Sequence, residues 1–556
     1  MATLEGWRLL VKGHEMDRSA QRTVPLLAAD GTLTRRGVLQ LGGLGLGAFT
    51  FGGLLSACTS ETPEGAAGAI DSERISAMMS DQFDNLDPTS TVFATTIAIN
   101  DLIYESLYRT GQYRPVGDPT PELAASLPEE VDPTTYRIAL REDVTFHDGS
   151  PLTADDVVFT IERIKDPNTP GFRSQFLSFI QEARSTGTYE VTLRLQHPTT
   201  LLVQRLSLVK VMSRKAVNAS SDAVKMSPVG TGPYQVVSGV SGQQLNLRKY
   251  GKYSGQRHIE FQNVEIKVAT DSAARVAGLK TGNAQVIQDV PGASVDSLSE
   301  ESAVGVEAVK GDFRIFFCFN CKKAPFDNKL ARQAILYGID RDAIVKSTFF
   351  GLAEPAWAGQ IQPDDPDYTR PSTVYRYDPQ HAKSLLRQAG VADGEPMSIG
   401  IVSTDYVASQ GPIIEENLRS LGLNPSIVPG APGAIPSRMS KGEFHAVVLA
   451  GASDIFNPTA EFYLRYVYYG AFPRTVSHWD TEQLRQIEAD LDEAVAAGNE
   501  EERKNALSKV QEGVQDEVPF ATLVWKRQIT GWSSSLENFR PLGHIGFPLD
   551  DVRVKS

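Results

Sequence analysis

The sequence has 556 residues, of which 41% are hydrophobic and 22% are charged. This length exceeds one ordinary hydrophobic core and predicts two or three domains of a globular protein. The formal net charge of −14 argues against nucleic acid as a partner, because binding phosphates requires clustered lysine and arginine.

The N-terminal part of the chain has the order of an export signal. Arg35 and Arg36 precede an apolar, glycine-rich stretch over 37–55, and small residues then lead to Cys58. This order is typical of exported proteins, and paired arginines indicate the twin-arginine route. A membrane-spanning helix is one alternative, but the glycines make it a poor one. A phosphate-binding loop is the other, and neither GxGxxG nor GxxxxGK[ST] occurs.

The four residues LSAC at 55–58 resemble a bacterial lipobox. That resemblance implies cleavage before Cys58 and attachment of lipid to its sulfur atom. We therefore predict a signal peptide over 1–57, with Met16 as a second candidate start, and a lipid anchor that holds the protein on the extracytoplasmic face of the cell membrane. Residues 58–69 are small and polar without periodicity, which predicts a flexible tether.

Beyond the tether, helical and strand patterns alternate along the chain. Thr153 followed by Asp156 is a capping-box pattern at the start of a helix predicted over 154–164. Further helices are predicted over 329–346, 379–389, 412–421, 481–497 and 500–515. Strands are predicted over 135–140, 189–195, 243–248, 261–268, 314–319 and 445–449. The alternation favours an α/β or mixed α+β fold, and no internal repeat is present.

Two cysteines follow Cys58, and they form the sequence CFNC at 318–321. A CxxC pair suits a redox or zinc site at a turn or helix start. Here the preceding residues read as a strand, in which positions i and i+3 lie about 10 Å apart and point to opposite faces. We therefore predict two unpaired thiols. No histidine stands at zinc spacing, so neither a metal nor a cofactor is predicted.

A series of short motifs carries a resemblance to a known family. The motifs are FDNLDP at 83–88, IYESLY at 103–108, PELA at 121–124, LREDVTFHDG at 140–149, PVGTGPY at 228–234, LKTG at 279–282, APFD at 324–327 and YDP at 377–379. In this order they resemble the peptide/nickel-type extracytoplasmic solute-binding proteins of ABC importers, known as family 5. The resemblance runs from about residue 75 to residue 530.

The resemblance implies a two-lobed clamp with an extra domain on the first lobe. A small-molecule ligand would bind in the cleft between the lobes, which close around it. The protein, expected to be a monomer, would then deliver the ligand to a membrane permease and its cytoplasmic ATPases. Carried onto this sequence, the first lobe comprises 70–108, 228–312 and 516–556, the extra domain 109–227, and the second lobe 313–515.

One aspartate is the candidate anchor for the ligand. In peptide-binding relatives an aspartate in a Gly-Trp-x-x-Asp-x-x-x-Pro pattern pairs with the ligand's α-amine. Here 450–458 reads AGASDIFNP, so Asp454 and Pro458 match while Ala450 and Gly451 depart. A carboxylate suits a cation in a closed cleft, because an unpaired buried charge is costly. The match favours a di- or oligopeptide ligand, and the alternative role for Asp454 is that of a turn or cap residue.

Other candidate ligand contacts come from two loops and two aromatic side chains. The loop at 89–93 follows the LDP motif, and the loop at 404–406 lies where relatives also line the cleft. Tryptophans are more often core residues, yet two of them are candidates. The predicted contacts are Thr89, Ser90, Thr91, Phe93, Thr404, Tyr406, Trp357 and Trp525.

The sequence contains no motif that indicates an enzyme. Neither a Gly-x-Ser-x-Gly elbow nor a His-Glu-x-x-His motif occurs, and we predict that the protein is not an enzyme. A receptor that informs a membrane sensor is an alternative to import. An oligosaccharide, a metal chelate, haem or an opine is an alternative to a peptide. Sugar sites need several aromatic platforms, whereas peptide sites need main-chain pairing and water-filled side-chain pockets.

Overall fold

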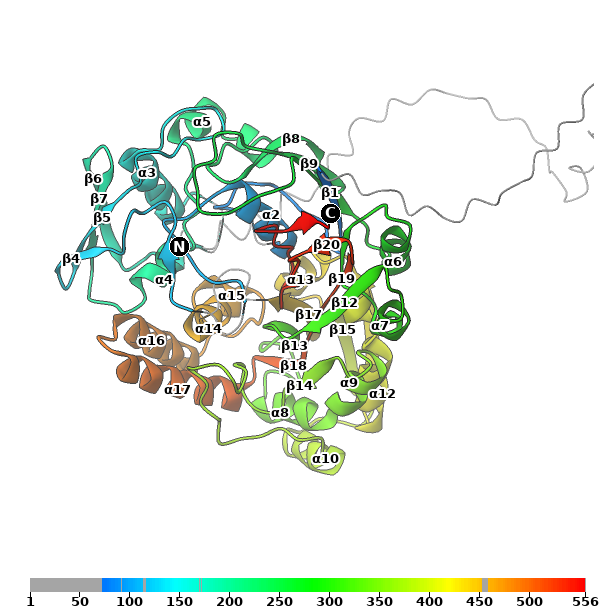
Figure 1. The fold of residues 1–556 in the computed structure, drawn as a ribbon. Helices are drawn as coiled ribbons and strands as arrows, with labels where there is room; N and C mark the ends of the chain where they lie inside the picture. Colours follow the sequence, from blue (N-terminus) through cyan, green and yellow to red (C-terminus); the bar gives the residue numbers. More distant parts are fainter. Residues whose placement is uncertain are drawn as a thin grey trace, which may run out of the picture. The chain divides into compact units, whose positions relative to one another are not determined.

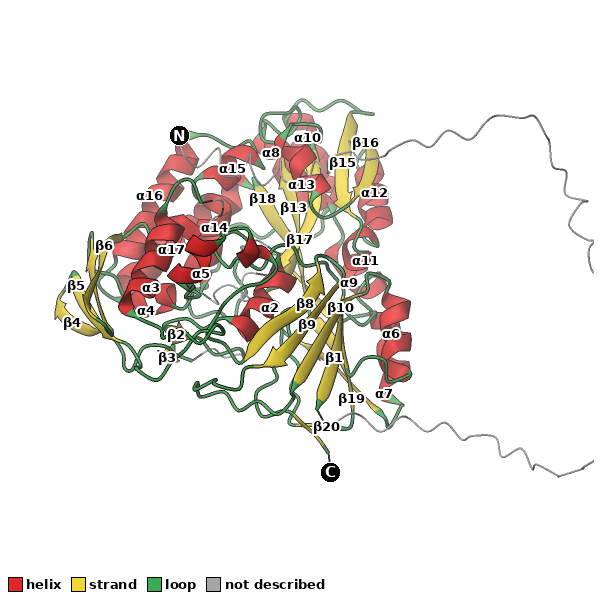
Figure 2. Ribbon diagram, turned by 90° about the horizontal axis from the view of Figure 1, so that it is seen from above, coloured by secondary structure: helices red, strands yellow, loops and turns green. Residues whose placement is uncertain are grey.

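A computed structural model describes residues 73–91, 93–113, 117–169, 171, 173–452 and 459–555. In these residues the elements gather around one seven-stranded, one six-stranded and one four-stranded sheet (Figures 1 and 2). Helices and strands are mixed throughout, which confirms the predicted mixed α/β class. No helix of the described residues is both long and apolar enough to span a membrane.

The seven-stranded sheet is the frame of the part that we call the first lobe. Its central strand β1 (Arg74–Met79) pairs in parallel with β10 (Asn263–Val268) and β11 (Val286–Gln288). The sheet order is β12 (Val304–Val309), β19 (Gln528–Ser533), β11, β1, β10, β9 (Gln244–Lys249) and β8 (Tyr234–Val240). Helices α6 (Ser272–Lys280) and α7 (Gly292–Ser299) pack against its β11, β19 and β12 side.

The six-stranded sheet is the frame of the part that we call the second lobe. Its order is β14 (Ala353–Pro355), β18 (Phe520–Lys526), β13 (Phe313–Phe319), β17 (Ala446–Ala452), β15 (Pro396–Val402) and β16 (Asn424–Gly430). Strand β13 is buried at every position, because the sheet is covered on both faces. Strand β15 runs parallel to both of its neighbours.

Two chain crossings join these sheets. Residues 310–312 lead from β12 to β13, and Arg527 alone separates β18 from β19. The segment 516–556, expected as a piece of the first lobe, therefore contributes one strand to each sheet. At the first crossing Gly311 lies against Gly543 so closely that a Cβ on either residue would collide with the backbone of the other. Glycine is required there to let the C-terminal segment approach the crossing.

The four-stranded antiparallel sheet is the frame of the part that we call the extra domain. It consists of β4 (Glu129–Asp132), β5 (Thr135–Ala139), β7 (Glu190–Leu195) and β6 (Ile180–Gly187), and it has a hydrophobic core of its own. Helix α3 (Ala154–Lys165) packs on β6 and β7. The capping box predicted from Thr153 and Asp156 is present at its start.

Most of the predicted helices occur, but the one expected over 329–346 is wrong. The chain forms α8 (Lys329–Gly338) and then α9 (Arg341–Ser347). The break follows from Asp340, which is extended and accepts a hydrogen bond from the Ala343 amide, so it begins a new helix and does not continue the old one. Helices confirmed at the other predicted positions are α10 (Pro379–Gln388), α12 (Gly411–Ser420), α16 (Glu482–Ala496) and α17 (Glu500–Glu517).

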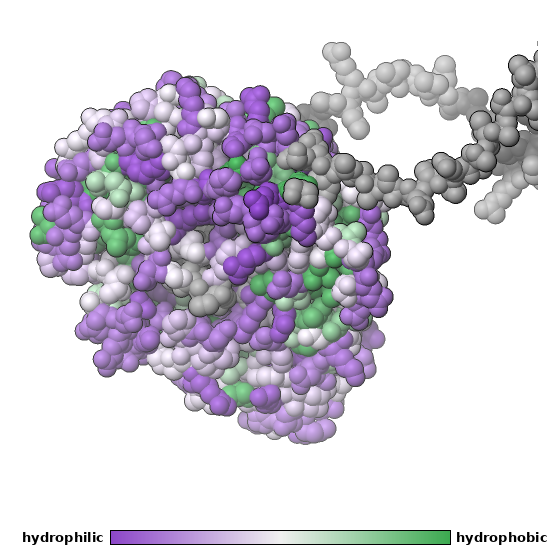
Figure 3. Space-filling model, viewed as in Figure 1, coloured by the Kyte–Doolittle hydropathy of each residue, from purple (hydrophilic) through white to green (hydrophobic). Residues whose placement is uncertain are grey.

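The surface and the thiols agree with the sequence. Hydrophilic residues make up most of the face drawn in Figure 3, as the composition predicts. Cys318 on β13 and Cys321, two residues beyond the end of that strand, are both free, as predicted. Burial raises the pKa of each thiol to about 12, so both remain uncharged at neutral pH.

Candidate functional site

The carboxyl ends of strands from both large sheets meet at one place. Ser80 and Asp81 follow β1, Asp289 follows β11, and Tyr406 in the short helix α11 (Asp405–Ala408) follows β15. The phenol of Tyr406 donates a hydrogen bond of 3.0 Å to Asp81 Oδ2, which connects the second lobe to the first. In open α/β sheets ligands bind beyond the carboxyl ends of the strands, so this is the position expected for a site.

A buried ion pair lies next to this contact. Lys526, at the end of β18, donates a hydrogen bond of 2.6 Å to Asp289 Oδ1, and the hydroxyl of Ser80 donates to the other carboxylate oxygen. The Lys526 ammonium lies 4.4 Å from the ring centre of Phe313 and 4.9 Å from that of Tyr406. Lys526 and Asp289 thus satisfy each other's charge. Asp81 makes no ion pair among the described residues.

The two carboxylates differ in protonation for a physical reason. Burial raises the pKa of Asp81 to about 6, and the nearby charge of Asp289 adds to the rise, while Tyr406, Lys526 and Arg275 oppose it. Burial also acts to raise the pKa of Asp289, but Lys526, Ser80 and Arg275 together outweigh it, and the pKa lies below its ordinary value. Asp81 is therefore the group of this site that changes charge near pH 6.

A row of side chains crosses one face of the six-stranded sheet. Arg314 on β13 lies opposite Gly451 on β17 and opposite Trp525 on β18, and Trp525 lies opposite Glu354 on β14. Directly opposite residues of antiparallel strands project to the same face. Trp525 is 5% exposed, and its indole N–H has no hydrogen-bond partner in the described part of the chain. The row therefore places a large aromatic side chain two strands away from the glycine at 451.

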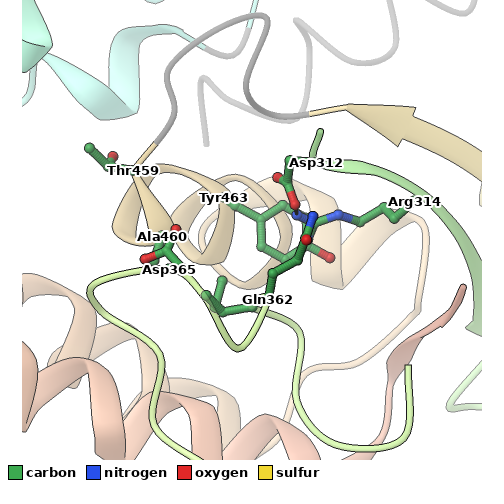
Figure 4. A pocket seen from close by; sticks show the side chains of 8 residues that line it. Asp312, Arg314, Gln362, Asp365, Thr459, Ala460 and Tyr463 are labelled. Carbon is green, nitrogen blue, oxygen red and sulfur yellow. Dashed lines mark ion pairs between the residues drawn. The ribbon is translucent and has the colours of Figure 1, made fainter. Parts of the chain in front are cut away.

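A small polar pocket adjoins this row (Figure 4). It lies between the start of β13, the loop around Gln362, and the first turn of α14 (Ala460–Tyr468). Arg314 is paired with Asp312, donates to the Gln360 carbonyl and stacks 3.4 Å over the ring of Tyr463. The pocket wall is thus held by interactions that leave little freedom to Arg314. Its lining residues are Asp312, Arg314, Ile361, Gln362, Asp365, Thr459, Ala460 and Tyr463.

A comparison with protein families decides the class of the protein. The family model for bacterial extracellular solute-binding proteins, family 5, matches residues 118–472. The chain belongs to this family. As a family 5 protein it is an extracytoplasmic solute-binding component of an ABC importer, and it binds its small-molecule ligand without being an enzyme.

Curated and solved relatives span nearly the whole chain. The glutathione-binding protein GsiB of Salmonella paratyphi A is 24% identical over 494 residues, which are 88% of this chain and 96% of the relative. A dipeptide-binding protein from Pseudoalteromonas sp. SM9913, solved with Met-Leu, has a TM-score of 0.78 at 20% identity and covers 87% of this chain and all of its own. AgaA from A. tumefaciens R10, solved with agropinic acid, has a TM-score of 0.77 at 22% identity and covers 87% of this chain and 99% of its own. The solved structures share the two-lobed fold predicted for this family 5 member.

The predicted loop at 89–93 is tied down by its own neighbours. Thr89 and Thr91, both buried, donate from their hydroxyls to Asp87 at 2.6 Å and to Asp84 at 2.7 Å. Ser90 donates to Asn85, and Phe93 is the half-buried residue before α2 (Ala94–Ile103). The hydroxyls of this loop thus maintain its conformation. Their contact with ligand stays a prediction.

The remaining predicted residues fall in different places. Tyr406 lies at the contact between the lobes, and Thr404 is the half-buried residue before α11. The guanidinium groups of Arg341 and Arg376 lie 5.0 and 5.3 Å from the ring centre of Trp357. Asp454, Cys58, Arg35 and Arg36 lie outside the described residues.

Sequence reasoning missed Asp81, Asp289 and Lys526. No local motif marks them, because each is an isolated charge at the end of a strand. Their signal would have been position: Asp81 comes two residues after the first buried strand, and Lys526 ends a fully buried one. Among the described residues no group of three or more His, Cys, Asp or Glu side chains forms a metal site.

Proposed function

We propose that this protein captures a short peptide with a free amino group, with glutathione as the first candidate, and delivers it to an ABC permease. The observation that carries this proposal is the carboxylate of Asp81. It lies at the carboxyl end of β1, accepts a hydrogen bond from Tyr406 of the second lobe, and makes no ion pair among the described residues. An ammonium group of the ligand would supply the missing cation.

The ligands of relatives support a peptide. GsiB is named for glutathione, and the Pseudoalteromonas protein is solved with Met-Leu. Both molecules are short peptides with a free α-amino group and at least one carboxylate. In our proposal Asp454 is a second acidic partner for the amine, and Trp525 supplies the aromatic surface that is lacking at Gly451. The unpaired indole N–H of Trp525 would donate to a ligand oxygen.

We further propose that the mature protein is a lipoprotein that acts as a monomer. The basis for the lipid anchor is the pair Arg35 and Arg36, the apolar stretch and the LSAC sequence that ends at Cys58. Mass spectrometry of the protein extracted from membranes tests this directly. A lipid-modified N-terminal Cys58, lost in Cys58→Ala, supports the anchor. An unmodified N-terminus at another residue overturns it.

A thermal-shift screen tests the ligand class. Residues 59–556 are the predicted mature chain without its lipid cysteine and include every described residue, so this chain can be used without the export signal. The probes are glutathione, di- to pentapeptides, oligosaccharides, metal chelates and haem. A ligand at 100 times its dissociation constant adds about 2.7 kcal/mol to the stability of the folded state.

Matched variants assign the amine partner. Asp81→Asn and Asp454→Asn are each expected to weaken a peptide's shift, whereas the exposed Asp296→Asn on α7 leaves it unchanged. A shift by peptides that survives Asp81→Asn contradicts the role of Asp81. A shift by chelates or sugars alone contradicts the peptide proposal while leaving the family unaffected. Uptake of the identified ligand in cells with and without the protein separates import from signalling to a membrane sensor.

A further inference from the structure

The extra domain and the second lobe share a buried contact that the ligand site does not include. Arg205, in the short helix α4 (Leu202–Leu206), forms an ion pair with Glu461 of α14. The two side chains are 2% and 0% exposed. Their positions are 256 residues apart in the numbering (461 − 205), so the pair fastens distant parts of the chain.

Aromatic stacking surrounds this ion pair. Phe176, which ends the short helix η1 (Arg173–Phe176), stacks on Phe462 of α14 with ring centres 4.1 Å apart. The guanidinium of Arg205 lies 4.9 Å from the Phe176 ring centre and 5.8 Å from that of Phe462. Phe176 and Phe462 form a hydrophobic cluster separate from the two main cores, with Leu208 and Tyr466 packed against it. The contact is thus a compact unit with components from both sides.

Each side of the contact has partners of its own. Glu461 also accepts a hydrogen bond of 2.7 Å from Arg465 one turn along α14. Arg465 in turn pairs with Asp492 of α16 at 3.0 Å. Arg205 stacks on Phe176 of its own domain. After separation Glu461 would keep a cation and Arg205 would keep an aromatic face, so neither charge would be left without a partner.

The helix that carries this contact also borders the pocket of Figure 4. Tyr463 faces Arg314 in that pocket, while its neighbours Glu461 and Phe462 face the extra domain. A rigid helix transmits a displacement of one face to the other. Movement of the second lobe at its pocket is therefore mechanically linked to the contact with the extra domain.

We propose that Arg205 and Glu461, with the Phe176–Phe462 stack, form a releasable latch between the extra domain and helix α14. The latch holds these two parts together in the ligand-free protein and is opened when the second lobe moves away. The extra domain thereby restrains movement of the second lobe. This inference does not depend on which ligand the protein binds.

Hydrogen–deuterium exchange of residues 59–556 without ligand tests the latch. Arg205→Met keeps the length and apolar character of the side chain and removes the charge. We expect at least tenfold faster exchange at both 173–208 and 460–468, while 135–139 and 190–195 in the extra-domain sheet change less than twofold. Arg184→Met, an exposed arginine of the same domain, is the matched control and is expected to change neither segment.

A second variant distinguishes loss of the ion pair from local misfolding of the extra domain in Arg205→Met. Glu461→Gln leaves the sequence of the extra domain intact and is expected to speed exchange in the same two segments. Arg205→Lys keeps the positive charge and is expected to exchange more slowly in these segments than Arg205→Met. Faster exchange confined to one side, equally fast exchange in the wild-type protein, or no change in either variant overturns the latch. Because no ligand is added, a failed thermal-shift screen leaves this result unaffected, and a failed latch leaves the ligand assignment unaffected.

Discussion

Tyr406 donates a hydrogen bond of 3.0 Å to Asp81, and with this bond the carboxyl end of β15 in the second lobe meets the carboxyl end of β1 in the first. The acceptor is a carboxylate whose pKa burial raises to about 6. A contact between two lobes and a titratable group thus coincide in one pair of residues. Both the stability of the folded protein and its affinity for a cationic ligand should therefore depend on the charge of Asp81.

The stability prediction follows from the direction of the shift. The folded pKa of Asp81 lies above the unfolded value of about 3.9, so its contribution is fully present below about pH 4 and is lost as the pH rises through about 6. Asp81→Asn mimics the protonated form. We expect the variant to match the wild type near pH 4 and to exceed its free energy of unfolding by about 2 kcal/mol at pH 7, somewhat less than the full shift because the residue is partly exposed. Urea unfolding at both pH values measures this, and a difference that does not vary with pH contradicts it.

The binding prediction has the opposite sign. A ligand ammonium pairs with the ionised form of Asp81, so affinity is expected to fall as the pH drops below about 6, by up to tenfold per pH unit. Calorimetric titration between pH 5 and about pH 8 with the peptide found by the screen measures the slope. Asp81→Asn should bind more weakly at pH 7 and show a flatter profile, whereas Asp296→Asn should follow the wild type.

The ion pair between Lys526 and Asp289, beside Asp81, is expected to stabilise the folded protein. Lys526→Met leaves the buried Asp289 without its cation, and we expect a loss of about 3–5 kcal/mol in the free energy of unfolding. The double variant Lys526→Met/Asp289→Asn should recover most of that loss, because no charge is then left unpaired. Lys509→Met, which breaks an exposed pair with Glu493, is the control and should leave the melting temperature unchanged.

The glycine contact at the first crossing should tolerate no side chain. Gly311→Ala places a methyl group against the carbonyl of Gly543, and we expect a loss of about 1–3 kcal/mol. Gly543→Ala should cost a similar amount, since its Cβ would meet the backbone of Lys310 and Gly311. Gly251→Ala is the matched control, because an added Cβ there meets nothing within 4 Å. Equal stability of all three variants would contradict this prediction, because it would show that the C-terminal segment can move away from the added methyl group without loss of free energy.

Local sequence signals predicted most of the helices, whereas the residues of the candidate site could not be predicted because they lie far apart in the sequence. The capping box at Thr153 and the Asp378, Pro379 and Gly390 pattern gave correct helices because caps act within one turn. The sequence did not reveal the break at Asp340, since the apolar period of α8 continues up to Ile339, directly before it. Asp81 meets Tyr406 across 325 positions, and Lys526 meets Asp289 across 237. Such pairs arise from the packing of whole sheets, which no local motif encodes.

The two crossings between the sheets also determine at which stage of synthesis the two large sheets can be completed. Strand β18 lies between β14 and β13, and the next strand β19 lies between β12 and β11. Each follows all the other strands of its sheet in chain order, yet each is an inner strand. Neither large sheet can be completed before the segment 520–533 has been made. A truncation before β18 would leave both lobes with an exposed inner edge, so the C-terminal segment makes folding of the two lobes a single, late event.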